Sequence, residues 1–110
     1  MSGEPSYIEL GVTDVAAAKE FYGSLLGWTV SDVPGGASVS TDSIDIGIHG
    51  GDSASHFEVF FVVPDLAASL GRIAELGGST IGEVNDAGDF GRWVECRDNQ
   101  GVRFGLREQA

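Results

Sequence analysis

Positive charge is scarce in this sequence. Six lysine and arginine residues stand against 17 aspartate and glutamate residues, which gives a net charge of −11, and Lys19 is the single lysine. Such a chain repels the phosphates of nucleic acids, so we expect no nucleic-acid partner. The acidity itself leaves two interpretations open. It is either an adaptation to solubility or salt, or a negative field that attracts a cationic ligand.

Cysteines and long apolar runs are scarce as well. Cys96 is the single cysteine, which excludes an internal disulfide framework, and we expect its thiol to be buried and inert. No apolar run approaches the roughly 20 residues of a membrane span, so we expect no membrane partner. Residues 1–5 contain neither the basic nor the apolar stretch of a signal peptide. A cytoplasmic location is therefore the simplest expectation.

What the sequence does contain is an internal repeat. A shift of 51 residues aligns Asp14 with Asp65 and Gly27 with Gly78 without a gap. Each aspartate precedes apolar residues at helical spacing, so it is predicted to cap the N-terminus of a helix. The first apolar stripe includes Val15, Ala18, Tyr22, Leu25 and Leu26, and the second includes Leu66, Leu70, Ile73 and Leu76. Phe21 is predicted to be a helix core residue beside Tyr22.

A strand is predicted before each aspartate. In the first strand Ile8 and Leu10 alternate with Tyr7 and Glu9, so the two pairs face opposite sides. Further strands are predicted at residues 28–32, 37–41, 44–49, 79–84, 92–97 and 102–107, separated by turns rich in Gly, Asp and Asn. Each repeat is therefore predicted to be a β-α-β-β-β module, the first over residues 5–50 and the second over residues 56–108.

The residues then match a known family. Asp14, Phe21-Tyr22 and Gly27-Trp28 resemble the "D…FY…LGW" signature of the vicinal oxygen chelate superfamily, which includes glyoxalase I, extradiol dioxygenases and bleomycin-resistance proteins. Pro64-Asp65-Leu66 and the segment 98–106 are similar to its second-half motifs. The resemblance implies one α+β domain over residues 1–110. In it, two tandem modules form an open, cup-like mixed sheet, with the helices on the convex side and the ligand in the concavity. It also implies a homodimer.

The resemblance further locates four metal-ligand positions. They fall at Tyr7, near Asp45, at Glu58 and at Gly105. Glycine offers no side chain and a neutral tyrosine is a poor zinc donor, so we expect no metal and no other cofactor at the usual site. A relocated divalent metal held by Asp45, His56 and Glu58 remains an alternative.

Several side chains on the same strand faces are candidates for ligand binding: Tyr7, Glu9, Asp45, His49, His56, Glu58, Phe60 and Arg103. Glu58 and Glu9 are the candidates for general acid–base catalysis. A third interpretation gives these carboxylates a structural role, in which Arg103 and Arg107 pair with them. Tyr7, Phe60 and Trp93 offer flat apolar walls, whereas Trp28 is expected to pack inside the fold.

Three functions follow from these candidates. The first is a protein that binds a small cationic or aromatic molecule without the superfamily metal, as bleomycin-binding members do. The second is a lyase, isomerase or dioxygenase similar to glyoxalase I, which uses a relocated metal or a carboxylate base. The third is a structural or regulatory partner of another enzyme. The fold alone does not decide among them, because function depends on the site.

Overall fold

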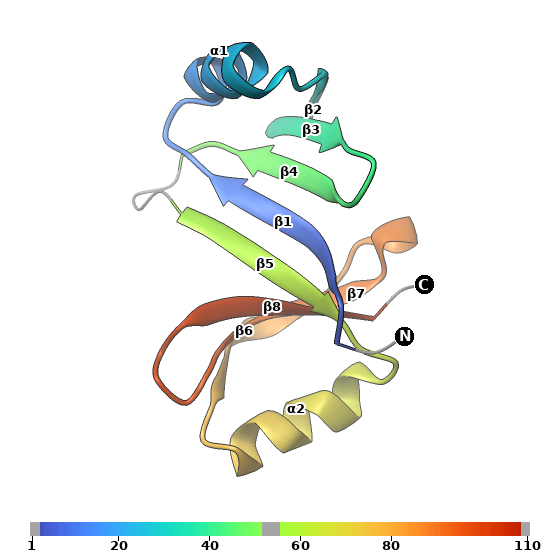
Figure 1. Cartoon of the computed structure of the whole chain (residues 1–110). Helices are drawn as coiled ribbons and strands as arrows, with labels where there is room; N and C mark the ends of the chain where they lie inside the picture. Colours follow the sequence, from blue (N-terminus) through green and yellow to red (C-terminus); the bar gives the residue numbers. More distant parts are fainter. Residues whose placement is uncertain (1–2, 52–55, 109–110) are drawn as a thin grey trace. The chain divides into compact units, whose positions relative to one another are not determined.

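The computed structural model describes residues 3–51 and 56–108 (Figure 1). Within these residues the chain forms eight β-strands and two α-helices, and it divides into two compact units. The first unit holds residues 7–58, and the second holds the residues before 7 together with those from 59 onward. The units nearly match the two predicted modules. The difference is that residues 56–58 group with the first unit, and the start of the first strand groups with the second.

The first unit contains the first module. Its elements are β1 (Pro5–Gly11), α1 (Val15–Leu26), β2 (Val30–Val33), β3 (Gly36–Ser40) and β4 (Asp45–His49). The strand order is β2-β3-β4-β1. β1 runs parallel to β4, while the other neighbouring strands are antiparallel. A parallel pair needs a long connection, and α1, β2 and β3 together form the connection between β1 and β4.

The second unit repeats this plan. Its elements are β5 (His56–Val62), α2 (Leu66–Glu75), β6 (Ser79–Asp86), the short 3₁₀ helix η1 (Gly88–Phe90), β7 (Arg92–Arg97) and β8 (Arg103–Glu108). The strand order is β5-β8-β7-β6, with β5 parallel to β8. The predicted α+β class and the β-α-β-β-β modules are thus confirmed. The six strands predicted after the helices each begin and end within two residues of their predicted bounds.

The helix ends follow the predicted capping. The Asp14 carboxylate accepts a hydrogen bond from the Ala17 N–H at 3.1 Å, and Asp65 accepts one from Ala68 at 3.0 Å. Gly27 ends α1 in the left-handed conformation, with φ at 71°. Within the described part of the chain, neither helix has the length and apolar content needed to cross a membrane.

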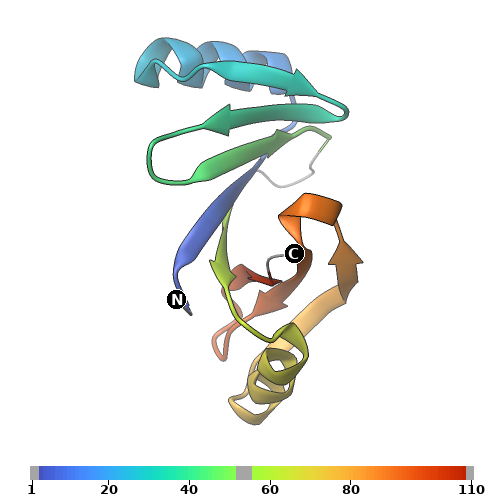
Figure 2. The ribbon, with the colours of Figure 1, turned by 90° about the vertical axis from the view of Figure 1, so that its right-hand side faces the viewer.

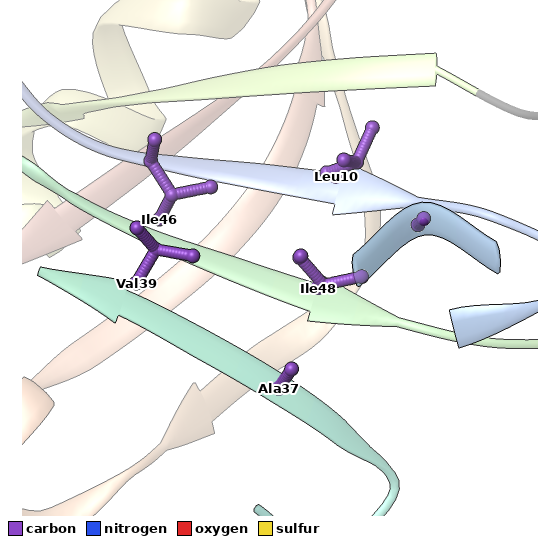
Figure 3. Packing of buried hydrophobic residues seen from close by; sticks show 6 residues of the cluster. Leu10, Ala37, Val39, Ile46 and Ile48 are labelled. Atoms are coloured by element: carbon purple, nitrogen blue, oxygen red, sulfur yellow. The ribbon is translucent and has the colours of Figure 1, made fainter. Parts of the chain in front are cut away.

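Each unit has an apolar core of its own. In the first unit Ala18 of α1 belongs to one cluster with buried residues of β1, β3 and β4. Figure 3 labels the strand members of this cluster. The buried members are Leu10, Ala18, Ala37, Val39, Ile46 and Ile48. The second core consists of Leu66, Val94, Cys96 and Leu106. Figure 2, like Figure 1, shows each helix on one side of the strands of its own unit. Trp28 packs against the first core and Cys96 is fully buried, both as predicted.

The predicted helix stripes are wrong at one end. Phe21, Leu25 and Leu26 are more than half exposed, although the pattern predicts them in the core. Val15, Ala18 and Tyr22 do pack against the first core. Helical spacing indicates which way a side chain faces, but not whether a strand lies opposite it. Leu76 and Val102 are exposed for a different reason: each stands just outside the helix or strand that the pattern assigned to it.

Candidate functional site

Three polar side chains of the first unit form a hydrogen-bonded chain. Tyr7 and Glu9 share one face of β1, and the Tyr7 hydroxyl donates to Glu9 Oε2 at 2.8 Å. The other carboxylate oxygen, Glu9 Oε1, lies 2.9 Å from Nδ1 of His49 at the end of β4. The Glu9 and His49 side chains are 26% and 40% exposed, so solvent reaches this end of the chain of groups. We call Tyr7, Glu9 and His49 the polar triad.

The polar triad depends on a glycine. Gly47 is buried on β4 directly opposite Glu9, and a Cβ built on it would overlap the Tyr7 hydroxyl and the Glu9 carboxylate. The two side chains therefore occupy the space that a side chain at position 47 would need. Any larger residue there must displace them, because its Cβ would overlap Tyr7 Oη and Cζ as well as Glu9 Oε2.

The second unit has a matching glycine under an aromatic ring. Gly105 on β8 lies opposite Phe60 on β5, and a Cβ built on Gly105 would overlap the Phe60 ring. Phe60 is 4% exposed and makes edge contacts with Phe90 and Trp93, at centroid distances of 6.3 and 5.7 Å. The 51-residue shift relates Phe60 to Glu9. The two modules therefore fill equivalent places, one with polar groups and the other with an aromatic cluster.

His56 and Glu58 come from the first residues of β5, which belong to the first unit. They share a strand face, as predicted from their spacing, and His56 Nε2 lies 3.7 Å from Glu58 Oε1. This distance is too long for a hydrogen bond, and the pair is ionic only when the imidazole is protonated. Glu58 is 3% exposed. A carboxylate this buried is costly unless compensated, and such groups are often functional.

The two candidate arginines contact groups that the sequence did not indicate. Arg103 forms an ion pair with Glu95 of β7. The Arg107 guanidinium lies 3.9 Å above the centre of the Phe90 ring and donates from Nε to the Phe90 carbonyl at 2.9 Å. Phe90 was missed because it lies in the turn 86–91, which reads as a plain loop. The pairing of Arg103 and Arg107 with Glu9 or Glu58 stays a prediction.

Strand register reassigns one metal-ligand position. Gly105 pairs with Phe60, and the residue that pairs with the equivalent Glu9 is Gly47 rather than Asp45. Asp45 is exposed and lies opposite Tyr7. By register, the first module's equivalent of Gly105 is therefore Gly47, so a glycine stands at this position in both modules. The sequence alone placed it two residues too early because the loops of the two modules differ in length.

The residues present do not fit the metal that the fold implies. Of the four positions, Tyr7, Gly47, Glu58 and Gly105, only Glu58 carries a carboxylate, and the Tyr7 hydroxyl donates to Glu9. The chain is described at residues 3–51 and 56–108, and in those ranges no three His, Cys, Asp or Glu side chains come together as a metal site. Asp45, His56 and Glu58 therefore do not form the relocated site there.

Titration behaviour is perturbed at a structural contact of the second unit. The Arg92 side chain hydrogen-bonds Glu108 and, together with the Leu66 N–H at 2.7 Å, holds the pKa of this carboxyl below its ordinary value. In return, the hydrogen bond and the negative charge of Glu108 raise the pKa of Arg92. Backbone N–H groups of Gln100 and Val102 lower the pKa of Asp98 in the turn before β8. The contacts that cause these shifts connect turns, strands and a helix end, and we assign them a structural role rather than a catalytic one.

Comparison with known proteins agrees with this fold. Residues 7–107 match the profile of the family described as glyoxalase-like domain. The chain is 30% identical to the putative glyoxylase CFP32 of Mycobacterium tuberculosis, and the match covers 94% of this chain and 45% of that protein. It is 29% identical to the anthracycline biosynthesis protein DauV of Streptomyces sp. strain C5, over 94% of this chain and 46% of that protein.

The chain therefore spans about half the length of the curated relatives it matches. Among solved structures, homoprotocatechuate 2,3-dioxygenase from B. fuscum aligns with a TM-score of 0.78 at 21% identity. That alignment covers 99% of this chain and 33% of the dioxygenase. At this identity the likeness supports the fold, and the side chains described above have to carry any argument about function.

Proposed function

This chain belongs to the glyoxalase-like domain family, within the vicinal oxygen chelate superfamily, and we propose that it binds a small organic molecule without the superfamily metal. One observation carries the proposal: both glycines at the carboxylate-ligand positions are covered by neighbouring side chains. A metal needs three or four N, O or S donors. Gly47 and Gly105 contribute no side-chain donor, and a donor introduced at either position would have to displace the polar triad or Phe60, which occupy the space.

The ligand we propose is aromatic and carries a positive charge. A net charge of −11 favours a cation over an anion, and the polar triad offers carboxylate and imidazole contacts. The Streptomyces relative is named as an anthracycline biosynthesis protein, so an anthracycline is the aromatic compound that we choose as a probe. The single buried cysteine is compatible with a reducing compartment such as the cytoplasm.

Two measurements test this proposal. The first is the metal content of protein purified without chelator and then equilibrated with Zn²⁺, Ni²⁺, Mn²⁺ or Fe²⁺. Stoichiometric metal that is lost in Glu58→Gln would overturn the metal-free reading. The second is the fluorescence of doxorubicin, an aminated anthracycline, titrated with the protein in parallel with its aglycone, which lacks the amine.

We expect doxorubicin to bind more tightly than the aglycone, and Glu9→Gln to weaken binding of the amine-bearing compound selectively. Glu83→Gln on β6 is the matched control, since it makes the same charge change at an exposed site far along the sequence. Equal affinity of the two compounds would contradict the cationic preference. Equal loss of affinity in Glu9→Gln and Glu83→Gln would show that the ligand responds to the net negative charge of the protein and not to a contact with Glu9.

The second candidate is an enzyme of lyase or isomerase type, favoured by the Glu9–His49 contact. A carboxylate that holds one imidazole nitrogen sets the tautomer and orientation of the ring, which is how general bases are prepared. In this arrangement His49 would exchange the proton and Glu9 would position it, whereas the sequence suggested Glu9 and Glu58 as the bases.

The hemithioacetal of methylglyoxal and glutathione is a direct substrate for testing glyoxalase-type activity. Turnover that falls in both His49→Gln and Glu9→Gln, with normal folding, would establish the enzymatic function. Turnover unchanged in both variants would exclude the polar triad as its source.

A further inference from the structure

Positive charge gathers on one side of β7 and β8 in the second unit. Val94, Cys96 and Leu106 of these strands belong to the second core, so the residues that alternate with them lie on the other side of the two strands. We call that side the arginine face, and its members are Trp93, Glu95, Arg97, Arg103, Gly105 and Arg107.

The charge of the arginine face is opposite to that of the whole chain. Three of the six lysine and arginine residues lie on it, and they stand with one carboxylate, that of Glu95. Three arginines and one glutamate leave a formal charge of +2 on these strands, in a chain of −11. Salt screens distant charges more than near ones, so a ligand at this face is exposed mainly to the local positive charge. The scarce cations are therefore placed where they attract an anion.

Strand pairing makes this arrangement costly in the absence of an anion. Arg97 and Arg103 are directly opposite each other, and like charges in that relation destabilise a sheet. Arg103 forms an ion pair with Glu95, while Arg97 donates from Nη1 to the Gly101 carbonyl at 3.3 Å. A bound anion would lower the repulsion between the two opposed guanidinium groups.

The fold does not itself require arginines at these positions. Counted from the two equivalent glycines of β4 and β8, Asp45 of the first unit corresponds to Arg103. Ser40, which pairs with Asp45, corresponds to Arg97. The two modules therefore share a backbone plan but carry opposite charge at equivalent places, which assigns the difference to the ligand and not to the fold.

Arg107 is held in an orientation that suits recognition of an acid group. Its guanidinium lies 3.9 Å above the centre of the Phe90 ring, and its Nε donates to the Phe90 carbonyl at 2.9 Å. Trp93 is half-buried and stands directly opposite Arg107 on β7. A planar guanidinium with a fixed orientation favours a carboxylate, and an indole beside it favours a flat aromatic body.

We propose that the arginine face binds an aromatic carboxylate. Arg107 holds the acid group, the aromatic body lies beside Trp93, and Arg97 and Arg103 supply the positive field that attracts the anion. The proposal goes beyond the function proposed above, because it uses residues of the second unit alone. A failure of the polar triad to bind a cation would leave it standing.

Nuclear magnetic resonance of isotope-labelled protein locates the binding. The chain has two indole N–H signals, from Trp28 in the first unit and Trp93 in the second. The probe is naphthoate, compared with its neutral amide and with acetate, which has the acid group but no ring. We expect naphthoate to shift the Trp93 signal and not that of Trp28, to bind more tightly than either comparison compound, and to bind less tightly as salt rises. Equal affinity for naphthoate and either comparison compound, or a shift at Trp28 instead, would overturn the proposal.

Substitutions assign the contact to Arg107. Arg107→Gln should weaken naphthoate binding by about tenfold, as expected for the loss of a charge-assisted hydrogen bond. Arg72→Gln on α2 is the matched control, since it makes the same charge change at a side chain that is 63% exposed outside the arginine face, and it should leave the affinity unchanged. Arg107→Lys keeps the charge and is the variant to use if Arg107→Gln does not fold. It should also bind more weakly, because an ammonium lacks the planar fork. Wild-type affinity in both Arg107 variants, or an equal loss in Arg107→Gln and Arg72→Gln, would contradict the assignment.

Discussion

Glu9 on β1 and His49 on β4 stand 40 residues apart in the chain and meet at 2.9 Å between Oε1 and Nδ1. The parallel pairing of β1 with β4 makes this contact possible. It places His49 opposite Gly11, which lies two residues after Glu9 and on the same face of β1. Tyr7 holds the other carboxylate oxygen. The carboxylate is thus clamped from both sides, and Gly47 below it leaves the room that this requires.

Gly47→Ala is expected to destabilise the protein by roughly 1–3 kcal/mol, because the added methyl displaces the Tyr7 hydroxyl and the Glu9 carboxylate. Urea unfolding measures the change. Gly71→Ala is the matched control, since an added Cβ at this exposed residue of α2 meets nothing within 4 Å. It should raise stability by about 0.5–1 kcal/mol through helix propensity. A neutral Gly47→Ala would mean that the polar triad is loosely held.

Gly105→Ala is expected to cost a similar roughly 1–3 kcal/mol in the second unit, where the methyl meets the Phe60 ring. Because Trp93 touches that ring, its fluorescence should change as well. The double variant Gly105→Ala with Phe60→Leu should lose less stability than the two single changes added together, since the smaller side chain makes room. Strict additivity would show that Phe60 is not what excludes a side chain at position 105.

A double-mutant cycle isolates the Glu9–His49 contact. Glu9→Gln and His49→Asn together should be less destabilising than the sum of the single variants by about 0.5–1.5 kcal/mol, as expected for one net hydrogen bond between partly exposed groups. Glu9→Gln combined with Glu20→Gln, at an exposed residue of α1 outside the polar triad, should be additive. Coupling as large in the control pair would point to general charge repulsion instead of the contact.

The two helix caps should contribute equally, as the repeat implies. Asp14→Ala and Asp65→Ala should each lower stability by about 1 kcal/mol, because each removes the acceptor for a first-turn N–H. The corresponding Asn variants should keep most of that stability. If only one of the two alanine variants is destabilising, a tertiary contact outweighs the cap at the other helix.

Acid sensitivity should come in part from Glu108. Its pKa is lower in the folded protein than its ordinary value of 4.5, since Arg92 and the Leu66 N–H stabilise the charged form. Its contribution is therefore present above pH 4.5 and is lost as the pH falls through the lower folded value. The stability gap between the wild type and Glu108→Gln should close on acidification. A gap that stays constant down to the acid transition would contradict this linkage.

Local patterns were sufficient for much of this architecture. The 51-residue repeat, two capping aspartates and period-two alternation gave both modules, with strand bounds within two residues. They also put Glu9 and Tyr7 on one face, because side-chain direction along a strand follows from position alone. The helix stripes were less reliable. Leu25 and Phe21 are more than half exposed, and no local pattern records what lies across from a helix turn.

By itself the sequence determined that this chain is a duplicated α+β fold of the vicinal oxygen chelate type and that a glycine stands at position 105. Only the tertiary structure decided that the equivalent place in the first module is Gly47 and not Asp45, and that side chains fill the space above both glycines. The physical reason is register. Pairing between β1 and β4, and between β5 and β8, joins residues about 40 positions apart, and loop lengths that differ between modules hide that pairing from any fixed shift along the chain.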